Sequence, residues 1–80
     1  MPNFFFDLRV GDRFIVDDKG TECETAEKAR EEALHSMVEV ASSYMVKGRQ
    51  SAIVTQVRRD DGTVIFQARL ALEIEGMTVG

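Results

Sequence analysis

The chain is poor in the residues that cross-link, interrupt or anchor a protein, with one cysteine, one proline, one histidine and no tryptophan among its 80 residues. A single cysteine, Cys23, cannot close an intramolecular disulfide, so the framework on which small secreted domains depend is excluded. No apolar run reaches the roughly 18 residues of a membrane-spanning helix. The N-terminus, MPNFFFDLR, also has no basic segment followed by a long apolar stretch, as a signal peptide would. We therefore expect a cytoplasmic protein without a membrane segment.

Positive charge is also scarce, because 10 basic residues face 14 acidic ones and the net charge is −4. An acidic chain opposes the counterion release that drives nucleic-acid binding, so only a local basic patch would support that function. The hydrophobic content of 44% and the charged content of 30% are typical of one small globular domain. We predict a single domain over residues 1–80, ordered over about 3–75, with 76–80 as a frayed tail.

Three consecutive phenylalanines near the N-terminus, Phe4, Phe5 and Phe6, account for most of the five in the chain. Successive side chains of a β-strand point to opposite faces of the sheet. Phe5 must therefore leave the face that Phe4 and Phe6 share, and it is the residue whose role most needs explaining.

A second apolar run at residues 13–16 follows this segment after Gly11, which indicates a β-hairpin. We predict a three-residue loop at 9–11. The resulting register opposes apolar to apolar and acidic to basic residues, which favours it over a slipped one. It pairs Phe4 with Val16, Phe5 with Ile15, Phe6 with Phe14 and Asp7 with Arg13.

A turn in DDKGTE at residues 17–22 precedes an expected helix with Thr25 as its N-cap, Lys47 in its last turn and Gly48 just beyond it. With about 3.6 residues per turn, its apolar side chains fall on one stripe. The stripe consists of Ala26, Ala29, Ala33, Met37, Val40, Ala41 and Tyr44, flanked by Leu34 and Met45. An amphipathic helix of this kind packs one side against a sheet.

The C-terminal part contains two apolar runs on either side of DDG, a strong turn signature. A two-residue loop at 61–62 pairs Val57 with Phe66 and Ile53 with Leu70, so this hairpin also has an apolar face. The order strand, strand, helix, strand, strand predicts an α+β fold, ββαββ, with a four-stranded antiparallel sheet and the amphipathic helix packed on one face.

The ordered set FFFDLRVGDRFIVDDKGTE, AEKAREEAL and VRRDDGTVIFQARLALEIE resembles a family of short bacterial proteins known only as a domain of unknown function. The resemblance spans about residues 3–75. It rests on the phenylalanine-rich first strand, the turn glycine, the DD.G.E pattern and the terminal hairpin. The resemblance implies the architecture and no activity, ligand or site.

Residues that could carry catalysis or bind a metal are few and poorly placed. His35 lies on the polar side of the expected helix, away from Cys23, so a nucleophile–base pair is not expected. Glu31, His35 and Glu39 form a helical row that offers at most a weak, exposed metal site. DDKG and DDG lack the alternating spacing of a calcium loop. We expect that the protein is not an enzyme and that it binds no metal and no cofactor.

One helix covers one face of the predicted sheet, so the other face remains open. Its predicted interaction residues are Phe5, Ile15, Val54 and Ile65 as apolar anchors and Arg13, Arg58 and Arg69 as polar partners. Isolated apolar residues on an exposed sheet are normal, but aromatic residues with arginine are also typical of interface cores. We predict a non-enzymatic protein-interaction or self-association module, with homodimerisation as one form of it. The alternative is a weak single-stranded nucleic-acid binder that uses the same face.

Overall fold

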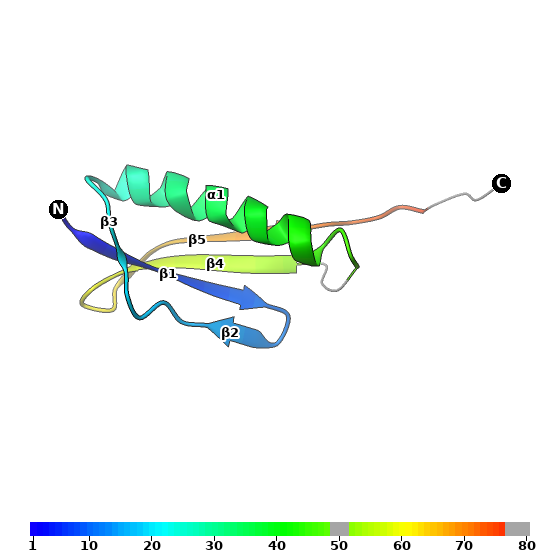
Figure 1. Ribbon diagram of the computed structural model, residues 1–80, viewed down its shortest axis with the longest axis horizontal. Helices are drawn as coiled ribbons and strands as arrows, with labels where there is room; N and C mark the ends of the chain where they lie inside the picture. The colour runs from blue at the N-terminus through cyan, green and yellow to red at the C-terminus, as the bar shows by residue number, and fades with distance from the viewer. Residues whose placement is uncertain (49–51, 77–80) are drawn as a thin grey trace.

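The computed structural model describes residues 1–48 and 52–76. One helix lies across one face of an antiparallel sheet, which confirms the predicted α+β fold (Figure 1). The elements are β1 (Asn3–Val10), β2 (Arg13–Ile15), β3 (Thr21–Glu22), α1 (Ala26–Tyr44), β4 (Ala52–Arg59) and β5 (Val64–Ala71). The strands lie in the order β2-β1-β4-β5, and β3, which was not predicted, pairs with β1.

The helix begins where its capping signal predicts. Thr25 Oγ1 accepts the Lys28 backbone N–H at 3.1 Å, which satisfies one of the free donors of the first turn. The helix ends at Tyr44, before the predicted Lys47, and the Met45 N–H donates to the Ala41 carbonyl. Gly48 then turns the chain away with a φ of +72°, a conformation that glycine adopts without cost.

The core between helix and sheet consists of two buried clusters. The first contains Phe4, Cys23, Ala29, Ala33 and Val57, and the second contains Val10, Met37, Ala41, Met45 and Ile53. Small alanines face the sheet at the start of the helix, whereas methionines fill the space at its end. Phe4 and Phe6 both belong to this side, so the predicted separation of the three phenylalanines is correct.

The β4–β5 hairpin has the predicted register over most of its length, with Val57 opposite Phe66 and Ile53 opposite Leu70. An irregularity follows at Val57/Arg58, where Arg58 pairs with Val64. A bulge of this kind places one extra residue, here Ile65, in the longer strand. The prediction did not include this bulge.

The predicted register of the N-terminal hairpin is wrong. Leu8 lies opposite Ile15, Arg9 opposite Phe14 and Val10 opposite Arg13. The loop is therefore the two residues at 11–12, where Gly11 has a φ of +64°. The physical reason is Val10, an apolar residue that is 3% exposed in the second cluster. In the predicted loop its side chain would not be buried, and the free energy gained from that burial would be lost.

Among the described residues, no helix is long and apolar enough to cross a membrane. The predicted frayed tail at 76–80 lies outside the described residues except for Gly76.

Candidate functional site: the helix-free face

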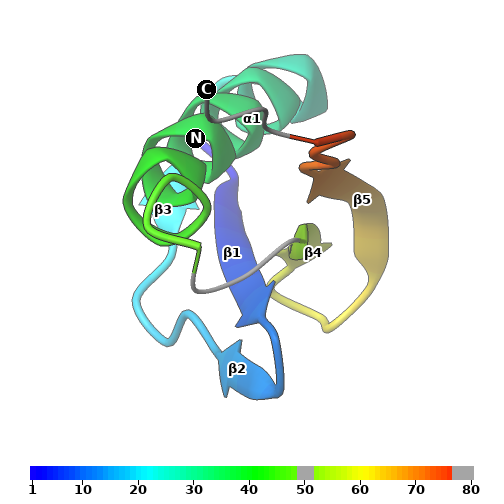
Figure 2. The same cartoon turned by 90° about the vertical axis from the view of Figure 1, so that its right-hand side faces the viewer.

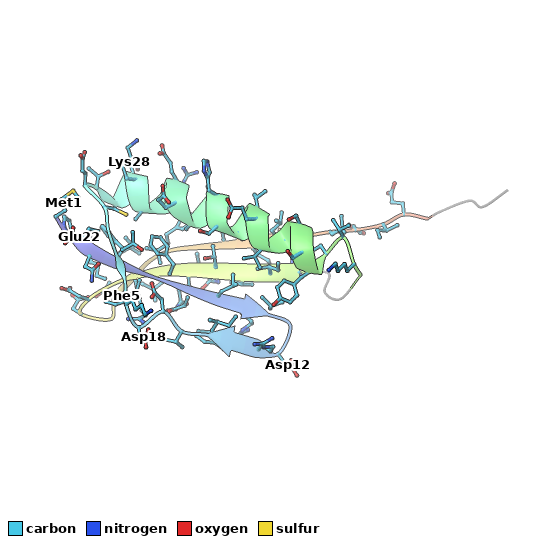
Figure 3. The ribbon with its side chains drawn as sticks, viewed as in Figure 1. Met1, Phe5, Asp12, Asp18, Glu22 and Lys28 are labelled. Atoms are coloured by element: carbon cyan, nitrogen blue, oxygen red, sulfur yellow. The ribbon has the colours of Figure 1, made fainter. Side chains whose placement is uncertain are left out.

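The face of the sheet opposite α1, called the helix-free face below, consists of alternate residues of the long strands. Strand register places Phe5, Asp7, Arg9, Phe14, Val54, Gln56, Arg58, Gln67 and Arg69 on it. Figure 3 shows Phe5 below the strands, on the opposite side from Lys28 of the helix. This face is where the sequence predicted the interaction surface.

An ion pair between Arg58 and Asp7 organises the middle of this face. Arg58 Nε donates to Asp7 Oδ2 at 2.8 Å, and its Nη2 donates to the Asp17 carbonyl at 2.8 Å. Gln56 Nε2 adds a second donor to Asp7 Oδ2 at 3.2 Å. The Asp7 side chain is 3% exposed and that of Arg58 is 22% exposed. Two strands and the segment after β2 are thus joined through one carboxylate.

Asp17 fills the gap on the outer edge of β1 between its pairings with β2 and β3. Its Oδ2 accepts the Phe6 N–H at 3.0 Å, while Oδ1 accepts the backbone N–H groups of Lys19 and Gly20. Its own N–H donates to Asp7 Oδ1 at 3.0 Å. Asp17 therefore takes the place of a strand residue where no strand pairs.

The pKa values of both aspartates lie below the ordinary value. Burial is the largest influence on the pKa of Asp7 and raises it, but hydrogen bonds from Arg58, the Asp17 N–H and Gln56 outweigh that effect. The same holds for Asp17, where burial raises the pKa but hydrogen bonds from backbone donors, led by the Phe6 N–H, lower it by a larger amount. Both carboxylates are thus stabilised in their charged form.

Gly20 closes this segment and gives a testable case of backbone constraint. Its φ is +77°, and an alanine Cβ there would lie 2.7 Å from Asn3 Nδ2. We expect Gly20→Ala to lower the free energy of unfolding by about 2 kcal/mol, because a left-handed alanine costs roughly 1–2 kcal/mol and Asn3 must also move. Chemical denaturation measures the effect.

Gly62→Ala is the matched control, since Gly62 also has a positive φ, +90°, but no atom within 4 Å of the added Cβ. We expect a cost of about 1 kcal/mol there. A loss at Gly20 no larger than the loss at Gly62 would contradict the close approach of Asn3.

Two arginine–phenylalanine pairs lie on the helix-free face. The Arg58 guanidinium carbon is 4.7 Å from the centre of the Phe5 ring, and that of Arg9 is 5.8 Å from the Phe14 ring. Both distances are within cation–π range. Phe5 is half-buried, whereas Phe14 is 51% exposed. Each aromatic side chain is thus held beside a cation rather than left free.

A hollow of about 170 Å³ opens beside the Arg9–Phe14 pair. It is lined by Asp7, Leu8, Arg9, Phe14, Val54, Gln56 and Gln67. Its size is below the roughly 300 Å³ typical of small-molecule sites, but it suits one inserted side chain. The lining offers an aromatic ring, an aliphatic floor and two side-chain amides.

Phe5, Val54, Arg58 and Arg69 lie on the helix-free face as predicted. Ile15 and Arg13 do not, because the three-residue shift in register moves them to the helix side, opposite Leu8 and Val10.

Ile65 was also predicted on this face, and that placement is wrong. The bulge brings it into contact with the first core cluster. A bulge breaks the alternation of faces, so strict counting along the strand fails at this point.

The prediction missed Arg9, Phe14 and Asp17. A two-residue Gly-Asp loop at 11–12 is itself a hairpin signal, and choosing it would have placed Phe14 beside Arg9 on this face. The signal for Asp17 was weaker and consisted of the aspartate three residues before Gly20. This spacing is typical of a turn in which the aspartate side chain accepts backbone N–H groups.

The residues considered for catalysis lie elsewhere. His35 is exposed on α1, as predicted, and Cys23 is 6% exposed in the first core cluster. Burial, with a smaller effect from Glu32, raises the pKa of the Cys23 thiol, which disfavours the reactive thiolate.

The family model described as a domain of unknown function (DUF6894) matches residues 3–71. The chain belongs to this family, which confirms the resemblance drawn from its motifs. The match begins with β1 and ends with β5, so it covers the helix and every described strand. No curated protein and no solved structure matches the chain.

Proposed function

We propose that this protein is a non-enzymatic, cytoplasmic interaction module whose helix-free face binds an acidic protein segment carrying an aromatic or large apolar anchor. The observation that carries the proposal is the hollow beside the half-exposed Phe14, with Arg9 stacked against that ring. Interfaces concentrate their binding energy in aromatic and arginine residues around such pockets.

The charge of this face supports an acidic partner. Arg58 is neutralised by Asp7, but among the described residues neither Arg9 nor Arg69 has an ion-pair partner. The chain as a whole has a net charge of −4, so its acidic groups are concentrated away from this face. An acidic segment would meet two available arginines and avoid the rest of the acidic surface.

The local chemistry supports binding rather than catalysis. Asp7, the one carboxylate in the hollow, already accepts hydrogen bonds from Arg58, Gln56 and the Asp17 backbone. A group held charged by several donors is a poor general base, because its pKa lies far from neutral pH. Its role in this proposal is to position Arg58.

Phe14→Ser tests the proposal. The probe is a synthetic peptide with one tryptophan flanked by glutamates, titrated into the full-length chain and followed by amide NMR. We expect shifts at Arg9, Phe14, Val54 and Gln67, and a weakening of roughly 5- to 10-fold in the variant, since loss of an aromatic anchor costs more than about 1 kcal/mol.

Ile15→Ser is the matched control, because Ile15 neighbours Phe14 and is 43% exposed, but lies on the helix side. We expect its affinity to stay within about twofold of the original. Equal weakening by both variants, or no shift on the helix-free face, would overturn the proposal.

Single-stranded nucleic acid is the second candidate, and the structure adds one observation in its favour. The helix-free face has two phenylalanines next to arginines, where the sequence predicted only one aromatic residue. Aromatic side chains on an open antiparallel sheet stack with unpaired bases. An oligonucleotide that binds more tightly than the peptide, with an affinity that falls steeply with salt, would favour this function over the first.

A further inference from the structure

The outer edge of β5 is the long open edge of the sheet. The sheet order places β5 at one end, next to β4 only, and β5 is eight residues long. At the opposite end, β1 is covered by the short strands β2 and β3 and by Asp17 between them. Figure 2 shows β5 on the outside of the sheet, beyond β4.

Natural proteins protect such edges with proline, lysine, inward-pointing charges or bulges, because free N–H and C=O groups pair readily with another strand. β5, with the sequence VIFQARLA, contains no proline, no lysine and no acidic residue. Its irregularity lies at its first residues, opposite Val57/Arg58, which leaves Phe66–Ala71 regular. Its one charge is Arg69, in a chain whose net charge is −4.

We propose that β5 pairs with β5 of a second copy of this chain, antiparallel and centred on Ala68, to form a symmetric dimer with one continuous sheet. In this register Gln67 lies opposite Arg69 of the second copy, and Phe66 lies opposite Leu70. Every pair is polar with polar or apolar with apolar. The same register brings the start of each β5 near the end of the other. Val64 of one copy then lies near Leu72 of the second copy, and these two residues are 48% and 42% exposed in the single chain.

Symmetry decides between registers. A twofold axis perpendicular to the sheet keeps both helices on the same side of the continuous sheet. Because directly opposed residues point to the same face, such an axis requires one residue of β5 to lie opposite its own copy. Centring on Arg69 would oppose two arginines, which is destabilising. Centring on Gln67 would oppose Arg69 to Ile65. Ala68 is the centre that gives matched pairs over the longest regular stretch.

This dimer goes beyond the proposed function and shares one residue, Gln67, with the lining of the hollow. It joins two helix-free faces into one surface with two copies of the Phe14 site. Phe14→Ser removes the partner site and leaves the β5 edge intact, so the two proposals fail independently.

Charge swapping at the paired positions tests the register by sedimentation equilibrium of the full-length chain. Gln67→Arg creates two like-charge contacts across the axis, and we expect the dimer to weaken by roughly 2- to 30-fold. The double variant Gln67→Arg with Arg69→Glu converts both contacts to opposite charges and is expected to restore or exceed the original affinity. Both positions are exposed on the helix-free face, so the monomer fold should persist. A chain that stays monomeric up to millimolar concentration, or a dimer indifferent to both variants, would overturn the proposal.

Cysteine cross-linking locates the axis directly, in a Cys23→Ala background. Directly opposed strand residues have Cα atoms about 4.5–5.5 Å apart, within disulfide range. Ala68→Cys should therefore form a covalent dimer on mild oxidation. Gln67→Cys is the control, because it would lie about 7–8 Å from its own copy on the diagonal and should cross-link poorly. Cross-linking of the control in preference to Ala68→Cys would refute this register.

Discussion

Phe4→Ala is expected to lower the free energy of unfolding by about 3–5 kcal/mol, the range found when a buried aromatic side chain is truncated. Phe4 is 1% exposed and packs in the first core cluster with Ala29 and Ala33 of α1, so its truncation leaves a cavity between the helix and the sheet. A domain of this size has a total stability of only about 4–12 kcal/mol. Urea denaturation at 25 °C should therefore show a variant that is close to unfolding.

Phe5→Ala provides the matched control, because it deletes the same atoms one residue further along the strand. Phe5 is half-buried on the helix-free face and its ring lies beside Arg58. We expect a loss of about 1 kcal/mol, from a cation–π contact and partial burial. Phe4→Leu, which leaves a smaller cavity, keeps the comparison measurable if the alanine variant does not fold. Equal losses at Phe4 and Phe5 would contradict the assignment of the two faces.

The separation of Phe4 and Phe6 from Phe5 was predictable because it depends only on the alternation of a strand. The helix and the β4–β5 pairing were equally predictable from the sequence, since Thr25 and the Asp61–Gly62 turn are local signals. Where local chemistry and apolar periodicity agree, one sequence is enough to place an element.

The N-terminal hairpin shows where this reasoning fails. Its predicted register satisfied every cross-strand pair, including Asp7 with Arg13, but it left Val10 in a loop. The core outweighed that local pairing, because burying a valine is worth about 1.5–3 kcal/mol and an exposed ion pair less than about 1 kcal/mol. Arg58, 51 residues away, then became the partner of Asp7. A contact so distant in sequence leaves no local signal.

The positions of Ile65 and Phe14 follow from such non-local choices. The bulge that moves Ile65 into the core and the register that exposes Phe14 are each decided by the packing of α1 on the sheet. The sequence therefore predicted which face of the sheet is open, but only some of the residues that lie on that face.

Asp7→Asn is expected to cost about 2–4 kcal/mol, although it changes neither size nor shape. The Asp7 carboxylate accepts hydrogen bonds from Arg58, Gln56 and the Asp17 N–H, and an amide would turn a donor toward at least one of them. Breaking a buried ion pair costs about 3–5 kcal/mol, and the 22% exposure of Arg58 reduces that value. Asp18→Asn is the control, because Asp18 is exposed in the neighbouring segment, and it should be nearly neutral. The two variants are compared by urea denaturation at neutral pH.

The same carboxylate predicts how stability depends on pH. The pKa of Asp7 is lower in the folded chain than in the unfolded chain, so the unfolded chain binds the proton first as the pH falls. The stabilisation is complete above about pH 5, declines below about pH 4, and disappears as the pH passes through the folded pKa. Asp17 contributes in the same direction, so Asp7→Asn should flatten this acid decline without abolishing it. If urea midpoints measured from pH 7 to pH 2.5 gave the variant the same acid slope as the original chain, the Asp7 carboxylate would not be held charged by Arg58, and the helix-free face would lack the contact that fixes its central arginine.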